Sequence, residues 1–174
     1  MLVQIFINTP KWVWALLASL LLIGLSQTRQ RRAGLARTAL VPLALAGFSL
    51  YGTVSAFGAS PLVWAAWGIP AVLVAQAVLN RPVPKGVRYD AAVRQFELPG
   101  SWVPLMLIAG IFLTKYVVGV SLALNPSLKA DIIFTTGVAA LSGLFSGVFA
   151  GRTARLLGLA LQLRSRRVAP VLTN

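Results

Sequence analysis

Five long apolar blocks, separated by shorter polar connections, organise the chain. They cover residues 10–25, 38–57, 61–80, 102–124 and 131–152. Their apolar residues are continuous rather than alternating, which favours helices over the strands of a β-barrel. A helix needs about 20 residues to cross a bilayer, and the blocks are of about this size. The pattern therefore predicts an all-α integral membrane protein with five transmembrane helices.

The only long polar connection, residues 81–100, lies between the third and fourth blocks. Within it, residues 87–89 and 95–98 alternate apolar and polar side chains, which is the periodicity of a strand. We therefore expect a short cytoplasmic β-hairpin or loop on the membrane surface, with its turn at residues 90–92.

The tail, residues 153–174, is basic. On a helix over residues 156–167 the polar and the leucine side chains fall on different faces, which indicates an interfacial helix that continues the fifth span. Leu157, Leu159, Leu161 and Leu163 also alternate with other residues, so a strand stays open as the alternative.

The basic residues predict the topology. Thirteen of the sixteen lysines and arginines lie in the first connection, in the long polar connection, and in the tail together with Arg152 at the end of the fifth block. With five spans these segments share one side, and the positive-inside rule makes that side the cytoplasm. The chain, residues 1–174, is thus expected to form a single membrane domain of the bacterial cytoplasmic (inner) membrane. Its N-terminus would be outside and its C-terminus cytoplasmic.

Composition narrows the chemistry. The chain is 57% hydrophobic and 11% charged, against roughly 25% charged in soluble domains. It has no Cys and no His, and its acids are Asp90, Glu97 and Asp131. Thiolate and imidazole metal sites are therefore excluded and carboxylate pairs are almost unavailable, so we expect no metal, no cofactor and no enzyme activity. The net charge of +13 is explained by topology, and no nucleic-acid partner is expected.

Small residues recur along the fifth block. Gly143, Gly147 and Gly151 are spaced by four, which places them on one helix face, and Ala139 and Thr135 extend the row. In a membrane such a row lets another helix backbone approach closely. We expect the other helices to pack around this one. The partner helix could belong to the same protomer, the commoner arrangement, or to another copy.

Lys115 is the one charge deep within a predicted span. A charge near mid-bilayer costs at least ~2.5–3.5 kcal/mol on insertion scales, so something should offset it. The residues expected at a similar depth form a candidate polar site with it, comprising Tyr51, Thr53, Thr135 and Thr136. Such a site would bind an anionic group or control ion passage. The competing interpretation, which we favour from the sequence alone, is a lysine that snorkels to the outer headgroups.

Several stretches resemble a family of small bacterial inner-membrane proteins of unknown function. The residues that carry the resemblance are Thr9-Pro10-Lys11-Trp12-Val13-Trp14, Phe96-Glu97-Leu98-Pro99-Gly100-Ser101-Trp102, Thr114-Lys115-Tyr116 and Gly147 to Arg152. The resemblance covers most of the chain. It implies a fold and a location, and because the family has no assigned activity it implies no catalytic residue.

Two functions follow from these patterns. The first is a membrane binding or transport-accessory protein with a polar site around Lys115. The alternative is a structural or assembly factor that docks partners through its basic cytoplasmic face. The expected partners are the lipid bilayer and anionic lipid headgroups on the cytoplasmic side, while a homo-oligomer or a membrane-protein partner stays open.

Overall fold

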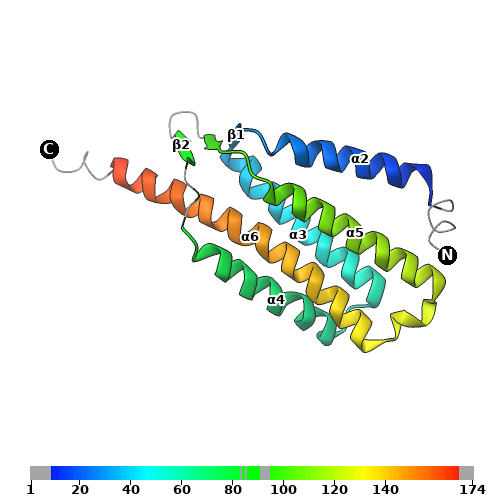
Figure 1. Ribbon diagram of the computed structural model, residues 1–174. Coiled ribbons are helices and arrows are strands. Elements are labelled where there is room, and N and C mark those ends of the chain that lie inside the picture. The colour runs from blue at the N-terminus through cyan, green and yellow to red at the C-terminus, as the bar shows by residue number, and fades with distance from the viewer. Residues whose placement is uncertain (1–8, 83, 85, 91–94, 169–174) are drawn as a thin grey trace.

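The computed structural model describes residues 9–82, 84, 86–90 and 95–168 of the chain. Within this part the fold is mostly helical, with five α-helices lying roughly alongside one another (Figure 1). The helices are α2 (Lys11–Ser26), α3 (Leu35–Phe57), α4 (Pro61–Leu79), α5 (Val103–Leu124) and α6 (Ile132–Val168), and a 3₁₀ turn, η1 (Pro126–Lys129), links the last two.

Four of these helices are long and apolar enough to cross a membrane, and they coincide with the second to fifth predicted spans. The first predicted span is α2, which has 16 residues and is about 24 Å long at ~1.5 Å per residue. That is shorter than a hydrocarbon core of about 30 Å. The apolar helices are those of a membrane protein, and α2 is the shortest of them.

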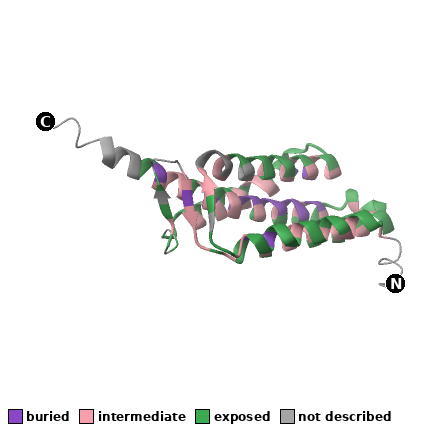
Figure 2. Ribbon diagram, turned by 90° about the horizontal axis from the view of Figure 1, so that it is seen from above, coloured by how far each residue is buried: buried purple, intermediate pink, exposed green. Residues whose placement is uncertain are grey.

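The long helix α6 lies at the centre of the bundle. It packs most extensively on α4 and next on α3, whereas α5 packs mainly on α2. Buried residues run along this central helix, while the outer helices are largely exposed (Figure 2). An apolar outer surface is what lipid would cover, so the bundle hides small residues inside and presents large apolar ones outside.

The glycine row of α6 faces α4. A Cβ added at Gly143 would overlap the carbonyl oxygen of Trp67, and one at Gly151 would lie 2.5 Å from the carbonyl oxygen of Ala75. The same relation joins Gly147 to Ala71. Both rows ascend in steps of four along the chain, so α4 and α6 run parallel with their backbones in direct contact. The glycines thus pack within one protomer.

Helices α2 and α5 form a second, antiparallel pair. At one end a Cβ added at Gly24 would lie 3.2 Å from Leu105 Cα. At the other end the hydroxyls of Thr9 and Tyr116 lie 2.7 Å apart, and the Trp14 and Tyr116 rings have centroids 6.3 Å apart. The backbone also joins them, because Ser101 N–H donates to the Gln27 carbonyl (3.1 Å).

One end of the bundle carries a small antiparallel sheet. Its strands are β1 (Arg31–Gly34), β2 (Arg88–Asp90) and β3 (Gln95–Leu98), in the order β1-β3-β2. The predicted hairpin strands of the long polar connection are present as β2 and β3. Of the turn predicted at residues 90–92, Asp90 belongs to β2, and residues 91–92 lie outside the described residues. The structure adds a strand that was not predicted, because β1 from the first connection pairs with the other edge of β3.

The sheet ties two distant connections together. Across β1 and β3, Arg32 Nη2 lies 2.9 Å from Glu97 Oε1, at directly opposed positions. Phe96, in the central strand, is completely buried (0% exposed). An exposed ion pair contributes little, about 0–1 kcal/mol, so the buried ring is the main stabilising element of this end.

Helix α6 continues far beyond the glycine row. It has 37 residues and is about 55 Å long, and it carries the basic tail away from the bundle (Figure 1). The predicted helical continuation through residues 156–167 is confirmed, and the strand alternative is wrong. Arg155 Nη1 donates to the Pro82 carbonyl (3.0 Å), which anchors α6 to the segment that follows α4. The last residues of the tail, 169–174, lie outside the described residues.

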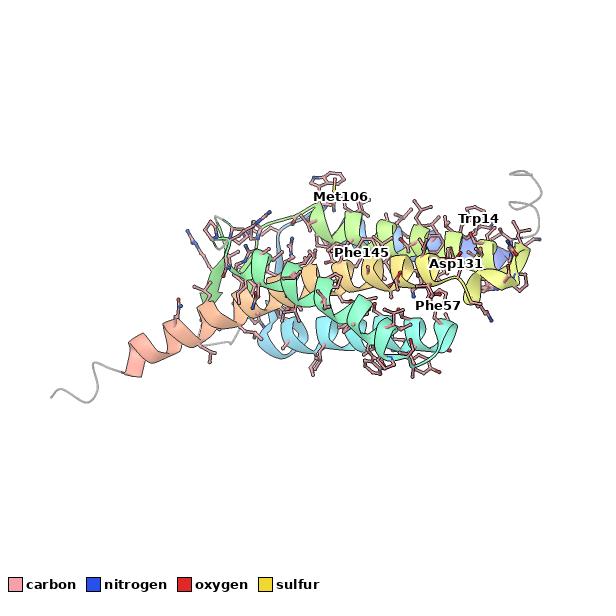
Figure 3. All side chains as sticks on the ribbon, turned by 90° about the horizontal axis from the view of Figure 1, so that it is seen from below. Trp14, Phe57, Met106, Asp131 and Phe145 are labelled. Carbon is pink, nitrogen blue, oxygen red and sulfur yellow. The ribbon has the colours of Figure 1, made fainter. Side chains whose placement is uncertain are left out.

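At the end of the bundle away from the sheet, side chains cap the first turns of α4 and α6. Ser60 Oγ accepts a hydrogen bond from Val63 N–H (3.3 Å) at the start of α4. Asp131 Oδ1 accepts one from Phe134 N–H (2.8 Å) at the start of α6. Figure 3 shows Asp131 and Phe57 towards this end, where the Phe57 and Phe134 rings meet edge to face, with centroids 6.1 Å apart.

Candidate functional site

Lys115 lies in the middle of α5 and points towards α3. A Cβ added at Gly52 would be 3.4 Å from Lys115 Nζ, so the ammonium lies against the α3 backbone at a glycine. Gly52 is five residues before the end of α3, about 8 Å at ~1.5 Å per residue. The ammonium therefore lies beside α3, on a lysine that is exposed as a whole, and a larger residue at position 52 would crowd it.

A cavity of about 170 Å³ lies between α3, α5 and α6, with Lys115 in its wall. The polar part of the wall is Lys115 and four hydroxyl residues, namely Ser49, Thr114, Ser142 and Ser146. The remainder is apolar, comprising Leu45, Ala46, Phe48, Ile111, Phe145 and Phe149. One cation and several hydroxyls thus converge in an otherwise apolar space.

Phe145 forms the contact that closes the cavity between α5 and α6. A Cβ added at Gly110 would lie 3.1 Å from Phe145 Cζ, so the ring rests on the α5 backbone. Figure 3 shows Phe145 on α6, next to α5. Apart from this region the two helices make little contact, which leaves the space that the cavity occupies.

Three of the four hydroxyls already donate their protons. Ser49 Oγ donates to the Ser142 carbonyl (3.3 Å), Ser146 Oγ to the same carbonyl (2.9 Å) and Thr114 Oγ1 to the Gly110 carbonyl (2.8 Å). Within the described part of the chain the fourth hydroxyl, that of Ser142, has no hydrogen-bond partner, although the residue is only 4% exposed. Its proton remains free for a ligand in the cavity, beside the three donors of an ammonium.

No carboxylate lines the cavity. The Asp131 carboxylate caps α6, and Glu97 pairs with Arg32 in the sheet. Asp90 is in β2, at the same end as Glu97. Across residues 9–82, 84, 86–90 and 95–168, no group of three or more acidic side chains could hold a metal ion. The positive charge of Lys115 therefore has no protein counter-charge in its own cavity.

The four residues predicted from depth to surround Lys115 do not line this cavity. Tyr51 is 71% exposed, and Thr53 is fully buried, with its hydroxyl donating to the Ser49 carbonyl (2.9 Å). Thr135 and Thr136, near the start of α6, donate to the carbonyls of Lys129 (3.4 Å) and Ile132 (2.7 Å). The hydroxyl residues that do line it are Ser49, Thr114, Ser142 and Ser146, none of which was predicted as part of this site.

A model of a family of unknown function, DUF6622, matches residues 1–167. The chain therefore belongs to this family, which confirms the resemblance to a family without an assigned activity. No curated protein and no solved structure matched the chain.

Proposed function

We propose that this member of the DUF6622 family is a multi-pass membrane protein that binds an anionic group at Lys115, as a binding or transport-accessory protein. The observation that carries the proposal is the position of Lys115, which lines a cavity without a carboxylate and whose ammonium lies against the α3 backbone at Gly52. A charge inside a membrane is costly unless it is paired. A bound anion would supply the missing counter-charge.

The residues around the cavity support binding rather than catalysis. An ammonium and the free Ser142 hydroxyl can both donate hydrogen bonds to an anion. Neither Cys nor His occurs in the chain, so neither a catalytic thiol nor a histidine-activated serine is available. We therefore propose that the protein is not an enzyme and needs no cofactor or metal.

The proposal includes a location and an orientation. The end of the bundle with the sheet also carries most of the lysines and arginines of the chain, so by the positive-inside rule it would face the cytoplasm. The membrane would be the bacterial cytoplasmic membrane, with the N-terminus outside. In that membrane α2 would also cross the bilayer, which brings the number of spans to five. Its short length can be accommodated by local thinning of the bilayer. Anionic headgroups would contact the basic end, and no nucleic-acid partner is proposed.

Single-cysteine labelling should report this topology directly, because the chain has no Cys of its own. Cysteine at Lys11, Ser60 or Ser127 should react with a membrane-impermeant maleimide in intact spheroplasts. Cysteine at Gln30 should react only after permeabilisation. All four positions are exposed in the structure. Protection of Lys11→Cys together with labelling of Ser60→Cys would show that α2 does not cross the membrane. Labelling of Gln30→Cys alone in intact spheroplasts would show that the orientation is opposite to the proposed one.

The binding function is tested by replacing the charge of Lys115. Lys115→Met keeps the length of the side chain and removes only the ammonium. The variant should reach normal abundance in the membrane yet fail to complement a deletion of the gene, measured as the phenotype that the deletion produces. Lys115→Arg should complement in part, because it keeps the charge in a wider, planar group.

Lys129→Met is the matched control for that experiment. Lys129 is exposed, in the turn between α5 and α6, and it does not line the cavity. This variant should complement fully. Full complementation by Lys115→Met as well, at equal abundance, would remove the anion site and leave Lys115 as a lysine of no functional consequence.

The second candidate function is a structural factor that docks partners through the basic end. One observation favours it, namely the sheet that joins the connection after α2 to the connection after α4. A fixed basic surface could bind a partner protein without any use of the cavity. Complementation separates the two functions, because charge-reversal at the exposed Arg29 and Arg88 should abolish docking and leave an intramembrane anion site intact.

A further inference from the structure

We infer that the ligand of the Lys115 cavity is an amphiphile with a small anionic headgroup and an aliphatic chain, which enters sideways from the bilayer. This inference rests on the proposed anion site and names the class of ligand that the site would take. Three features of the cavity lead to it, namely its depth, the direction of its opening and its size.

The first feature is depth. The cavity residues of α3 lie between positions 45 and 49, and those of α5 between positions 111 and 115. Each is at least eight residues from either end of its helix, about 12 Å at ~1.5 Å per residue. In helices that cross a bilayer, such positions lie at the level of the acyl chains. A solute from the water phase would have to cross much of this depth to arrive.

The second feature is the opening between α3 and α5. Helix α5 packs on α2 rather than on α3, so these two helices do not seal the cavity. Phe48 is 75% exposed and Leu45 is 44% exposed, and Lys115 is also exposed. All three line the cavity and reach the outer surface of the bundle. The cavity is therefore open towards the side, where lipid would be.

The third feature is size. Pockets that enclose drug-sized ligands have roughly 300–1,000 Å³, and this cavity has about 170 Å³. It can hold a carboxylate or a phosphate group but not a whole organic anion of that size. The remainder of the ligand must stay outside, against the apolar rim of Leu45, Phe48 and Ile111. An aliphatic chain satisfies this requirement, since it prefers the bilayer and apolar side chains to water.

Retention of defined lipids by the purified full-length protein tests the inference. The protein in an uncharged maltoside detergent would be mixed with oleate, oleyl alcohol, dioleoyl phosphatidic acid or inorganic phosphate, and bound species counted by native mass spectrometry. Oleate and oleyl alcohol share a chain and differ in charge, whereas inorganic phosphate has the charge and no chain. We expect oleate or phosphatidic acid to be retained about tenfold more than oleyl alcohol, the difference expected for one charge-assisted contact.

Two pairs of variants locate the binding. Lys115→Met should remove the preference for the charged lipid, and Lys129→Met should keep it. Ala46→Phe should block the cavity with the charge intact, because Ala46 is in its wall. Ala44→Phe makes the same change two residues away at an exposed position outside the cavity, and it should have no effect.

The outcomes separate this inference from the anion site itself. Retention of oleate alone or of phosphatidic acid alone, dependent on Lys115, supports the amphiphile and tells which headgroup is preferred. Retention of inorganic phosphate that depends on Lys115, with no preference for either charged lipid, overturns the amphiphile and leaves the anion site standing. Retention of oleyl alcohol by the parent protein to the same extent as both charged lipids also overturns the inference, and complementation by Lys115→Met then decides the proposed function.

Discussion

Replacing Gly143 by alanine should destabilise the folded protein by about 3 kcal/mol, although the change adds a single methyl group. The added Cβ would overlap the carbonyl oxygen of Trp67, which is backbone of α4 and cannot rotate away as a side chain can. The whole of α4 would have to move from α6. Thermal unfolding of the purified protein in detergent, followed by circular dichroism, measures the effect.

The same helix provides the control. A Cβ at Gly137 would meet nothing within 4 Å, so Gly137→Ala should cause no loss and could gain about 0.5–1 kcal/mol from helix propensity. Gly147→Leu and Gly158→Leu make a second pair, since position 147 faces the Ala71 carbonyl and position 158 faces open space. Equal unfolding temperatures for Gly143→Ala and Gly137→Ala would contradict close backbone packing of α4 on α6.

The glycine row shows what a local pattern can and cannot predict. Spacing of four places Gly143, Gly147 and Gly151 on one face of a helix without any knowledge of the fold. It does not tell which helix comes to that face. The partner is α4, where the carbonyl oxygens of Trp67, Ala71 and Ala75 make the contact. Ala71 and Ala75 are also small and spaced by four, but Trp67 is large, and alanines spaced by four are too common in these helices to identify α4 as the partner.

The helices were predictable because a continuous apolar run can cross a membrane as a helix, which pairs its own backbone N–H and C=O groups. The third strand was not. Residues Arg31–Gly34 are a short piece of a basic connection with no alternation of apolar and polar side chains, and their strand conformation comes from pairing with residues more than sixty positions away. A pairing over that distance leaves no signal in the local sequence. The alternation within residues 95–98, by contrast, did predict β3.

The sequence identified Lys115 as the central residue of the candidate site but not the residues that line the cavity with it. Lys115 stands out because a charge within an apolar run is rare. Depth along a helix can be counted from its ends, but the direction of each side chain around the helix axis depends on how the helices are rotated against one another. Tyr51 and Ser49 differ in depth by only about 3 Å, yet Ser49 lines the cavity and Tyr51 faces outward.

Phe96→Ala should cost about 3–5 kcal/mol, the usual range for truncating a fully buried aromatic ring. Phe96 is 0% exposed in the central strand, where Ala33 and Tyr89 are its neighbours on β1 and β2. Without the ring, the exposed Arg32–Glu97 pair is too weak to hold the strands together.

Hydrogen exchange gives this prediction a local readout. In the Phe96→Ala variant, the ladder amides that join β1 to β3 should lose protection, while amides along the α4–α6 contact should keep theirs. Trp102→Ala removes a larger ring that is 61% exposed at the same end, so it should leave β1 protected and cost far less. Unchanged protection of β1 in the Phe96→Ala variant would mean that backbone pairing alone holds the two basic connections together, and the docking surface would then not depend on a buried core at this end.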